Sequence, residues 1–174
     1  MSELVQRTFQ GIIEATKKDV SLTKGVFRVT SEMDEHVRVK NTARDFEFIA
    51  DEPEALAGTN LGPNPVEYLL ASLGSCQVIT YQVVASLKGI QLNNVKVETK
   101  GNIDWRGFLG IDENVRPGYH KIEVETIIDS DESPERIQEL IKEVEARCPV
   151  LDNLVNAVKV ESKISIVNEK NPVV

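Results

Sequence analysis

The sequence predicts an α+β fold, because its patterns indicate strands, one central helix, further strands, two helices and a last strand, in that order. The strand-like segments alternate apolar and polar residues, whereas the long apolar stretch after Asn64 has helical periodicity. The 174 residues contain no Pro/Gly/Ser-rich linker. We therefore expect a single domain over 1–174.

The residues before the long apolar stretch are predicted to form strands. Residues 4–14 are interpreted as the first strand, and alternation continues in 25–30 and 36–40. Phe46 and Phe48 lie two positions apart and would share one face of the next strand.

The central helix has a clear start and stop. Asn64 can cap it, Pro65 suits its first position, and Glu67 completes a capping-box pattern. Gly89 suits its left-handed end. Residues 68–87 carry no charge and approach the length of a membrane span, about 20 residues. Their serine, threonine and glutamine side chains favour instead a helix buried in a soluble protein.

Two more strands and a last one are expected after this helix. Residues 95–103 and 120–128 alternate, with Ile122 and Val124 on one face of the second segment. Residues 162–167 read as the final strand.

A second helix is predicted to open at Ser133 and to end at Pro149, which must stop or kink it. Residues 151–158 suggest a short third helix. The apolar stripe of the second helix recurs at helical spacing and consists of Ile137, Leu140, Ile141, Val144 and Cys148.

Charge and the amino terminus exclude several classes of protein. The formal charge is −8, from 28 acidic and 20 basic residues, and the basic residues form no stripe. Nucleic acid is therefore not an expected partner. The first residues show no signal-peptide pattern, so we expect a cytoplasmic protein in a reducing compartment, without structural disulfides.

Cys76 and Cys148 are the two cysteines of the chain, and both fall on helical stripes. Two thiols at distant positions suggest thiol and disulfide redox chemistry. The competing interpretation is that each cysteine fills a gap in the core as a small apolar residue. The stripe that would bury Cys76 most deeply in the central helix consists of Leu69, Leu73, Cys76, Thr80, Val83 and Leu87.

A buried thiol needs a nearby cation to ionise and react. Arg44 has the parity of Phe46 and Phe48 and is the first candidate, since it would face the core. Arg38, whose parity sends it to solvent, is the second. Glu67 could hold such an arginine by a bidentate contact, beside or instead of its capping role.

Other chemistries lack the required residues. His36 and His120 are the only histidines, and neither has a cysteine or carboxylate at metal-ligand spacing. No glycine-rich phosphate loop occurs. We expect no metal and no cofactor. A hydrolase with a Cys–His pair stays open, because such partners converge in space rather than in sequence.

Residues 62–76, GPNPVEYLLASLGSC, followed by Arg147-Cys148-Pro149-Val150, resemble the OsmC/Ohr family of osmotically inducible and organic-hydroperoxide-resistance proteins. The resemblance implies an intertwined homodimer with antiparallel sheets around a long buried central helix and active sites at the subunit interface. It also implies Cys76 as peroxidatic thiol, Cys148 as resolving thiol, a small apolar hydroperoxide as substrate, and a dithiol reductant such as dihydrolipoamide.

One departure from the family pattern leaves two functions open. Family peroxidases commonly have glutamate directly after the Asn-Pro pair, where this chain has Val66 and then Glu67. On a helix this shift turns the carboxylate by about 100°. The leading hypothesis is a cysteine-based organic hydroperoxide reductase; the alternative is a redox-inactive dimer that binds a small apolar ligand. Residues 105–112 add apolar side chains that would line a pocket or cover the partner subunit.

Overall fold

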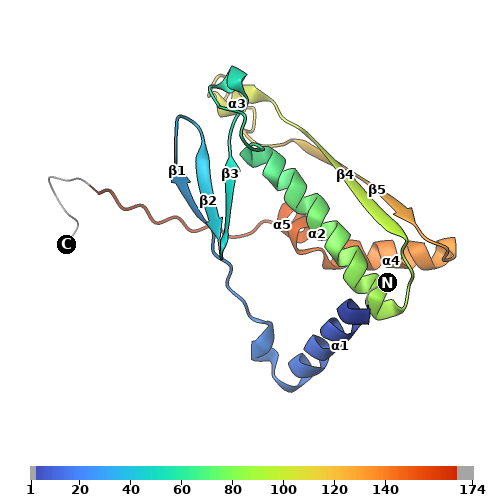
Figure 1. Ribbon diagram of the computed structural model, residues 1–174. Helices are drawn as coiled ribbons and strands as arrows, with labels where there is room; N and C mark the ends of the chain where they lie inside the picture. Colours follow the sequence, from blue (N-terminus) through green and yellow to red (C-terminus); the bar gives the residue numbers. More distant parts are fainter. Residues whose placement is uncertain (1–2, 168–174) are drawn as a thin grey trace.

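The computed structural model describes residues 3–167, which form mixed helix and sheet around one long helix (Figure 1). Short 3₁₀ turns lie at Val20–Thr23 and Glu54–Leu56. The helices and strands are, in chain order, α1 (Glu3–Lys18), β1 (Thr30–Met33), β2 (Val39–Ala43), β3 (Phe46–Ala50), α2 (Pro65–Lys88), β4 (Asn94–Asn102), α3 (Trp105–Phe108), β5 (Lys121–Asp129), α4 (Pro134–Arg147) and α5 (Pro149–Val155).

The predicted start and stop of α2 are confirmed. The Asn64 side chain accepts a hydrogen bond from the Glu67 N–H at 2.9 Å, and a Glu67 carboxylate oxygen accepts one from the Asn64 N–H at 2.8 Å. At the other end Gly89 adopts φ 66°, the left-handed conformation that glycine accommodates without strain. Local interactions therefore define both ends of the helix that carries Cys76.

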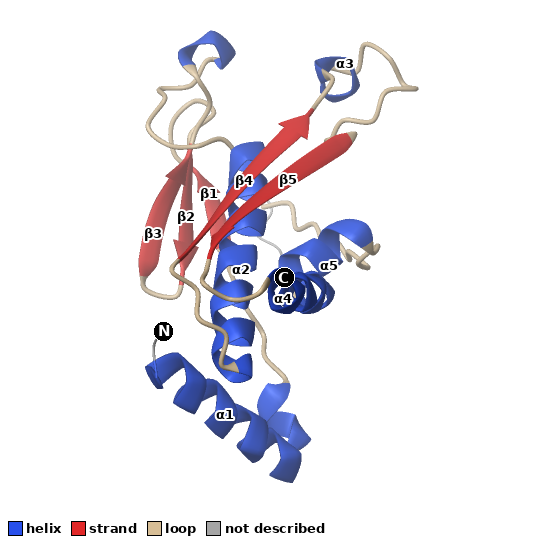
Figure 2. Ribbon diagram, turned by 90° about the vertical axis from the view of Figure 1, so that its right-hand side faces the viewer, coloured by secondary structure: helices blue, strands red, loops and turns tan. Residues whose placement is uncertain are grey.

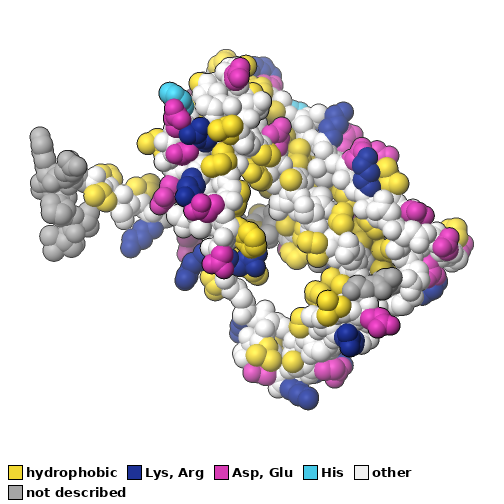
Figure 3. All heavy atoms as spheres, in the orientation of Figure 1, with side chains coloured by type: hydrophobic (Ala, Val, Ile, Leu, Met, Phe, Trp, Pro, Cys, Tyr) yellow, Lys and Arg dark blue, Asp and Glu magenta, His cyan; other side chains and the backbone are white. Residues whose placement is uncertain are grey.

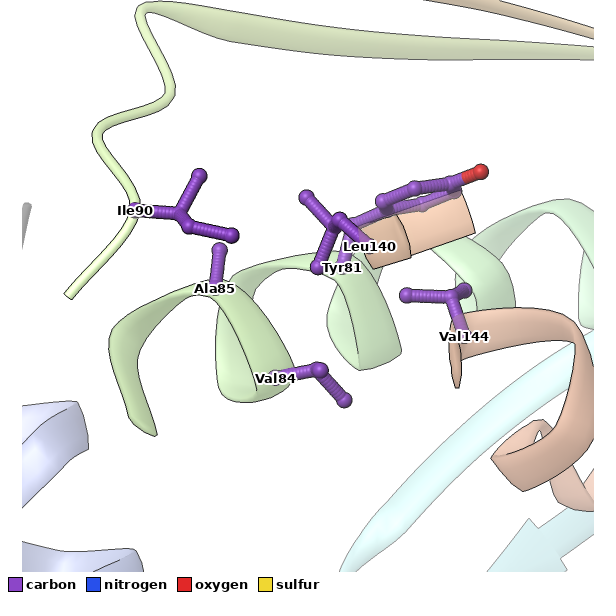
Figure 4. Close-up of a cluster of buried hydrophobic side chains, with 6 residues drawn as sticks. All are labelled: Tyr81, Val84, Ala85, Ile90, Leu140 and Val144. Carbon is purple, nitrogen blue, oxygen red and sulfur yellow. The ribbon is translucent and has the colours of Figure 1, made fainter. Parts of the chain in front are cut away.

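The core lies where α2 packs against α4 and the hairpin of β4 and β5 (Figures 2 and 4). The hairpin is antiparallel and pairs Asn94 with Asp129 at one end and Asn102 with Lys121 at the other. The buried cluster comes from α2, α4 and the turn after α2, and consists of Tyr81, Val84, Ala85, Ile90, Leu140 and Val144. This packing fixes α4, and thereby the residue that follows it, against the middle of α2.

A second antiparallel sheet, in the order β1-β2-β3, stands beside α2 with little covering it in this chain (Figure 1). Phe48 contacts the Tyr68 ring with centroids 5.5 Å apart, and the Tyr68 hydroxyl donates to the Ile49 carbonyl at 2.6 Å. Elsewhere its apolar residues are open, since Met33 and Phe46 are 85% and 62% exposed. The space-filling view shows hydrophobic side chains along this side of the molecule (Figure 3).

The loop between β3 and α2 is organised around Asp51, which is only 1% exposed. Its carboxylate accepts hydrogen bonds from the Thr59 hydroxyl, the Thr59 N–H, the Leu61 N–H and the Glu52 N–H, at 2.6 to 3.2 Å. The Thr59 hydroxyl bond and these backbone donors lower the pKa of Asp51 from 3.8 to about 2. The loop that leads to Asn64 is thus held in place by the Asp51 carboxylate, which we call the charged hub.

The first predicted strand, 4–14, is wrong, because this segment belongs to α1. Its apolar residues recur at spacings of three and four, and Val5 and Phe9 turn partly away from solvent on one face. α1 packs against α2 (Figure 1).

Other predicted boundaries also needed correction. Of the segment 25–30, only Thr30 lies in a strand. In the segment 36–40, β2 begins at Val39, because the preceding residues form a turn in which His36 has φ 52°. The third helix ends at Val155, three residues before the predicted end. The predicted strand at 162–167 is not formed, because the tail extends away with no strand beside it (Figure 1). The strands at 95–103 and 120–128 are confirmed as β4 and β5 to within one residue.

Candidate functional site

The structure brings the two cysteines together. Cys76 lies in the middle of α2, and Cys148 forms the junction between α4 and α5, just before Pro149. The predicted stripe of α4 is confirmed where Leu140 and Val144 pack on α2 with no exposed surface. Since Cys148 continues this stripe by one turn, its side chain also points to α2, where the Cys148 thiol lies close enough to Cys76 for its pKa to respond to it.

The environment of Cys148 favours its protonated form. Burial is the largest influence and raises the pKa of the Cys148 thiol. The interaction with the Cys76 side chain and the charge that Cys76 can carry raise this pKa further, while the N–H groups of Leu151 and Val150 lower it. Cys148 is therefore a proton-bearing neighbour that can donate its S–H toward Cys76.

Cys76 is the more accessible of the two thiols, contrary to the sequence prediction. Cys148 is 1% exposed, whereas Cys76 is only partly buried. The buried stripe of α2 runs through Leu73, Gln77 and Tyr81, one position away from Cys76. Cys76 thus lies at the edge of the packed face, which leaves its sulfur in reach of a small substrate.

The two candidate arginines lie on the β1–β3 sheet, and neither contacts Cys76 within residues 3–167. Arg44 was expected to face the core, but it occupies the exposed turn between β2 and β3 with φ 56°, its guanidinium 5.0 Å from the Phe46 ring centroid. Parity along a strand does not extend into a turn residue. The structure therefore places Arg44 where it has no carboxylate partner in the described chain.

Arg38 was expected to face solvent, yet its side chain is only 16% exposed. Its guanidinium donates to Asp34 at 2.7 Å, to Glu35 at 2.8 Å and to the Thr59 hydroxyl at 3.1 Å. These contacts link the β1–β2 turn to the loop around Asp51. Two carboxylates already neutralise Arg38, so its visible role is structural.

Glu67 is used as a capping residue. One of its carboxylate oxygens accepts the Asn64 N–H, and none of the arginines in residues 3–167 forms an ion pair with it. Cys76 follows nine residues later, about 13 Å along the helix axis. In this chain the acid and the thiol are therefore separate features of one helix.

An apolar cavity of about 400 Å³ is lined by residues one helical turn away from each cysteine, although neither Cys76 nor Cys148 itself lines it. Its walls come from α2, β5 and α5 and include Leu69, Leu73, Ile122, Val124, Leu151 and Leu154. Leu73 is one turn before Cys76, and Leu151 is one turn after Cys148. The cavity wall thus comes within one helical turn of each cysteine along the chain.

The rim of this cavity contains Arg116 and Tyr119, which the sequence analysis did not single out. They belong to the loop before β5, and a Pro-Gly pair at 117–118 was the available sign of a shaped turn. The apolar loop 105–112 lies at the far tip of the hairpin, where Phe108 is exposed (Figure 2). In residues 3–167, no three His, Cys, Asp or Glu side chains gather as a metal-binding group.

These features define a two-cysteine α+β protein. Its capped central helix has a cysteine at the middle and an antiparallel hairpin on one side, and the second cysteine lies at a helix junction. The chain belongs to the OsmC-like protein family, whose model matches residues 58–163. That range contains both cysteines, Glu67 and the whole cavity. Proteins of this family are soluble, so α2 is a core helix although its length and composition would suffice to cross a membrane.

Solved structures of the family share the fold. An OsmC-like protein from Mycoplasma pneumoniae is 23% identical, with a TM-score of 0.68 over 78% of this chain and 91% of that one. OhrB of Bacillus subtilis, an organic hydroperoxide resistance protein, is 22% identical. Its TM-score is 0.53, and the match covers 79% of this chain and 96% of OhrB. An organic hydroperoxide resistance protein from Legionella pneumophila is 14% identical. Its TM-score is 0.57, and the match covers 75% of this chain and 89% of that protein. No curated protein matches the sequence.

Proposed function

We propose that this protein is a cytoplasmic, cysteine-based reductase of organic hydroperoxides that works as a homodimer. The observation that carries the proposal is the thiol pair, in which a partly accessible Cys76 lies beside a buried Cys148 whose pKa is raised by burial. The family and the hydroperoxide-resistance proteins among its solved structures support the same substrate class.

In the proposed cycle the Cys76 thiolate attacks the distal oxygen of the hydroperoxide. The O–O bond breaks, an alkoxide leaves and takes up a proton, and Cys76 becomes a sulfenic acid. The Cys148 thiol then attacks the Cys76 sulfur, so that water leaves and a Cys76–Cys148 disulfide forms. A dithiol such as dihydrolipoamide reduces the disulfide to two thiols and is itself oxidised to a disulfide. No metal or cofactor takes part.

A cation is needed near Cys76, and we assign Arg44 of a second subunit as the first candidate. Arg44 is exposed and has no carboxylate partner in residues 3–167, whereas Arg38 is held by Asp34 and Glu35. Both arginines lie on a sheet that stands apart from the thiols of its own chain. Glu67 could orient the incoming arginine through the carboxylate oxygen that the cap leaves free.

The accessible surface of the chain supports a homodimer. It measures 13463 Å², whereas a compact monomer of 19.4 kDa exposes about 8,500 Å². The excess includes the apolar side of the β1–β3 sheet and Ile79 of α2, which is 61% exposed. Surfaces of this extent are typical of obligate interfaces, which resemble a divided core.

The alternative is a redox-inactive dimer that sequesters a small apolar ligand. The use of Glu67 in the cap and the positions of both candidate arginines on another sheet favour it, since a thiol without a nearby cation reacts slowly.

Stopped-flow measurement of cumene hydroperoxide consumption, with reduced lipoamide as electron donor, tests the two functions against each other. The proposal expects steady turnover in which one lipoamide is oxidised per peroxide. Binding of the peroxide without consumption, in protein whose two thiols titrate as free, would instead establish the binding protein.

A further inference from the structure

The cavity beside the thiols has an asymmetric charge that its apolar walls do not explain. Two basic side chains, Arg116 and Lys121, line it together with His120. Lys121 is paired with Glu123 at 2.8 Å. Arg116 has no ion pair within residues 3–167, although the protein carries a net charge of −8. A guanidinium without a carboxylate in an acidic protein is available to bind an anion.

Close packing holds the backbone of Arg116 in place. A methyl group at Gly107 would lie 2.6 Å from the Arg116 carbonyl oxygen, so α3 presses directly against this residue. The nearby Tyr119 ring lies against Gly101 of β4, where a methyl group would come within 2.4 Å of it. The loop that carries Arg116 is therefore held in place by packing, and a fixed backbone is needed for a side chain to make a defined contact with a ligand.

The same loop sets the distance between Arg116 and the thiols. The Tyr119 hydroxyl donates to the Val66 carbonyl at 3.1 Å, which places this rim beside the first turn of α2. Cys76 follows Val66 by ten residues, about 15 Å along the helix axis. Apolar side chains at Leu69 and Leu73 line the path between them. The cavity thus joins a cationic rim to apolar walls, and its wall at Leu73 lies one turn of α2 before Cys76.

We propose that Arg116 is a specificity-determining residue that binds the carboxylate of an anionic amphiphile, so that the apolar chain follows the cavity and a hydroperoxide group along that chain reaches Cys76. This inference rests on the proposed function for its reactive end. The anchoring of a carboxylate at Arg116 is independent of turnover, because it needs only the rim and the apolar walls.

Two substrates that differ in one charge provide the test, namely linoleic acid hydroperoxide and its methyl ester. The unaltered protein should show a KM for the acid about tenfold below that for the ester. This is the gain in affinity expected from one charge-assisted contact at a partly exposed site. Arg116→Glu should remove this preference, Arg116→Lys should restore part of it, and kcat should change little. Arg106→Ala is the matched control, because Arg106 pairs with Asp104 on the neighbouring loop.

Calorimetric titration with decanoate and with methyl decanoate tests the anchor without any peroxide. Decanoate should bind more tightly, and its advantage should shrink at high salt and vanish in Arg116→Glu. Equal affinities for acid and ester in the folded parent protein would overturn the inference even if turnover is normal. The absence of turnover together with Arg116-dependent decanoate binding would overturn the proposed function and leave the inference standing. A fall in kcat for both hydroperoxides in Arg116→Glu would make Arg116 the activating cation instead and would also overturn the inference.

Discussion

At the scale of single residues, the difference between Cys76 and Cys148 is one of exposure. Cys76 lies within α2 and Cys148 at the junction of α4 and α5, where Cys148 is 1% exposed and burial opposes its ionisation. An accessible sulfur beside a protonated donor suits a first oxidation at Cys76 and a later attack by Cys148. The roles proposed for the two cysteines are therefore best tested by replacing each one separately.

We predict that Cys76→Ser abolishes peroxide consumption, whereas Cys148→Ser consumes one equivalent and stops at a sulfenic acid. The reason is that Cys148 has a raised pKa, so its thiolate is scarce at neutral pH and becomes frequent only at more alkaline pH. Dimedone labelling followed by mass spectrometry checks both variants. A label on Cys148 in the first variant, with none on Cys76 in the second, would reverse the assignment.

A second prediction concerns the cation. Arg44→Ala should slow the alkylation of Cys76 by iodoacetamide at neutral pH and leave the assembly intact, if Arg44 acts across the subunit interface. Arg38→Ala should act mainly on stability, because Arg38 joins Asp34 and Glu35 to the Thr59 loop. The measurement uses a Cys148→Ser background so that one thiol reports. Unchanged alkylation rates in both variants would eliminate both arginines.

At the scale of elements, the entry to α2 depends on a reciprocal cap and on the loop before it. The cap joins the side chain of each residue to the backbone of the other, and the loop is tied to Asp51. These contacts set the direction in which α2 starts, and therefore where Cys76 meets α4.

Asn64→Ala should lower the free energy of unfolding by about 1 kcal/mol, the usual loss when an N-cap side chain is removed. Urea denaturation measures it. Glu67→Gln separates the two roles of Glu67, because glutamine can still accept the Asn64 N–H. Normal stability with reduced peroxidase turnover in Glu67→Gln would assign the carboxylate a part in catalysis, and normal values of both would leave it a cap.

The charged hub at Asp51 predicts a pH dependence of stability. Its folded pKa of about 2 lies below the ordinary 3.8, so its stabilising contribution is complete above about pH 5 and is lost as the pH falls toward 2. Asp51→Asn should therefore unfold at lower urea concentration than the parent at pH 6, with a difference that shrinks on acidification. The exposed Asp45 provides the control, and an Asp51→Asn difference that stayed constant from pH 6 to pH 2 would contradict the assignment.

At the scale of the whole molecule, the chain leaves apolar surface open at both ends of its sequence. The β1–β3 sheet exposes one apolar side, and the tail after α5 is extended with Val160 and Ile164 uncovered. Association of two chains would cover both, and it would bring the arginines of one sheet toward the thiols of another subunit.

Light scattering should accordingly detect a dimer at low micromolar concentration. Removal of residues 157–174 should weaken it, because the alternating tail then no longer contributes its apolar face. A folded monomer in the full-length protein would contradict both the dimer and the shared active site. A dimer unaffected by the truncation would contradict only the role of the tail.

Features that depend on near neighbours along the chain could be predicted from the amino-acid sequence. The cap of α2, its glycine end and the stripe of α4 are each produced by residues within a few positions of one another, and all were predicted correctly. The β4–β5 hairpin followed from strict alternation. In residues 4–14 the strand-like and the helix-like spacing of apolar residues compete over a short segment. The local pattern was therefore insufficient, and α1 was predicted as a strand.

Which distant groups meet could not be predicted from the sequence, because it depends on how the elements pack. The contact of Cys76 with Cys148 depends on how α4 docks on α2, and a shift of one position in the buried stripe turned Cys76 toward the accessible edge. Arg44 and Arg38 exchanged their expected environments, because a turn and a loop, not strand parity, placed them. The cavity with Arg116 at its rim arises from α2, β5, α5 and a loop, and packing between segments so far apart leaves no periodic sign in the sequence.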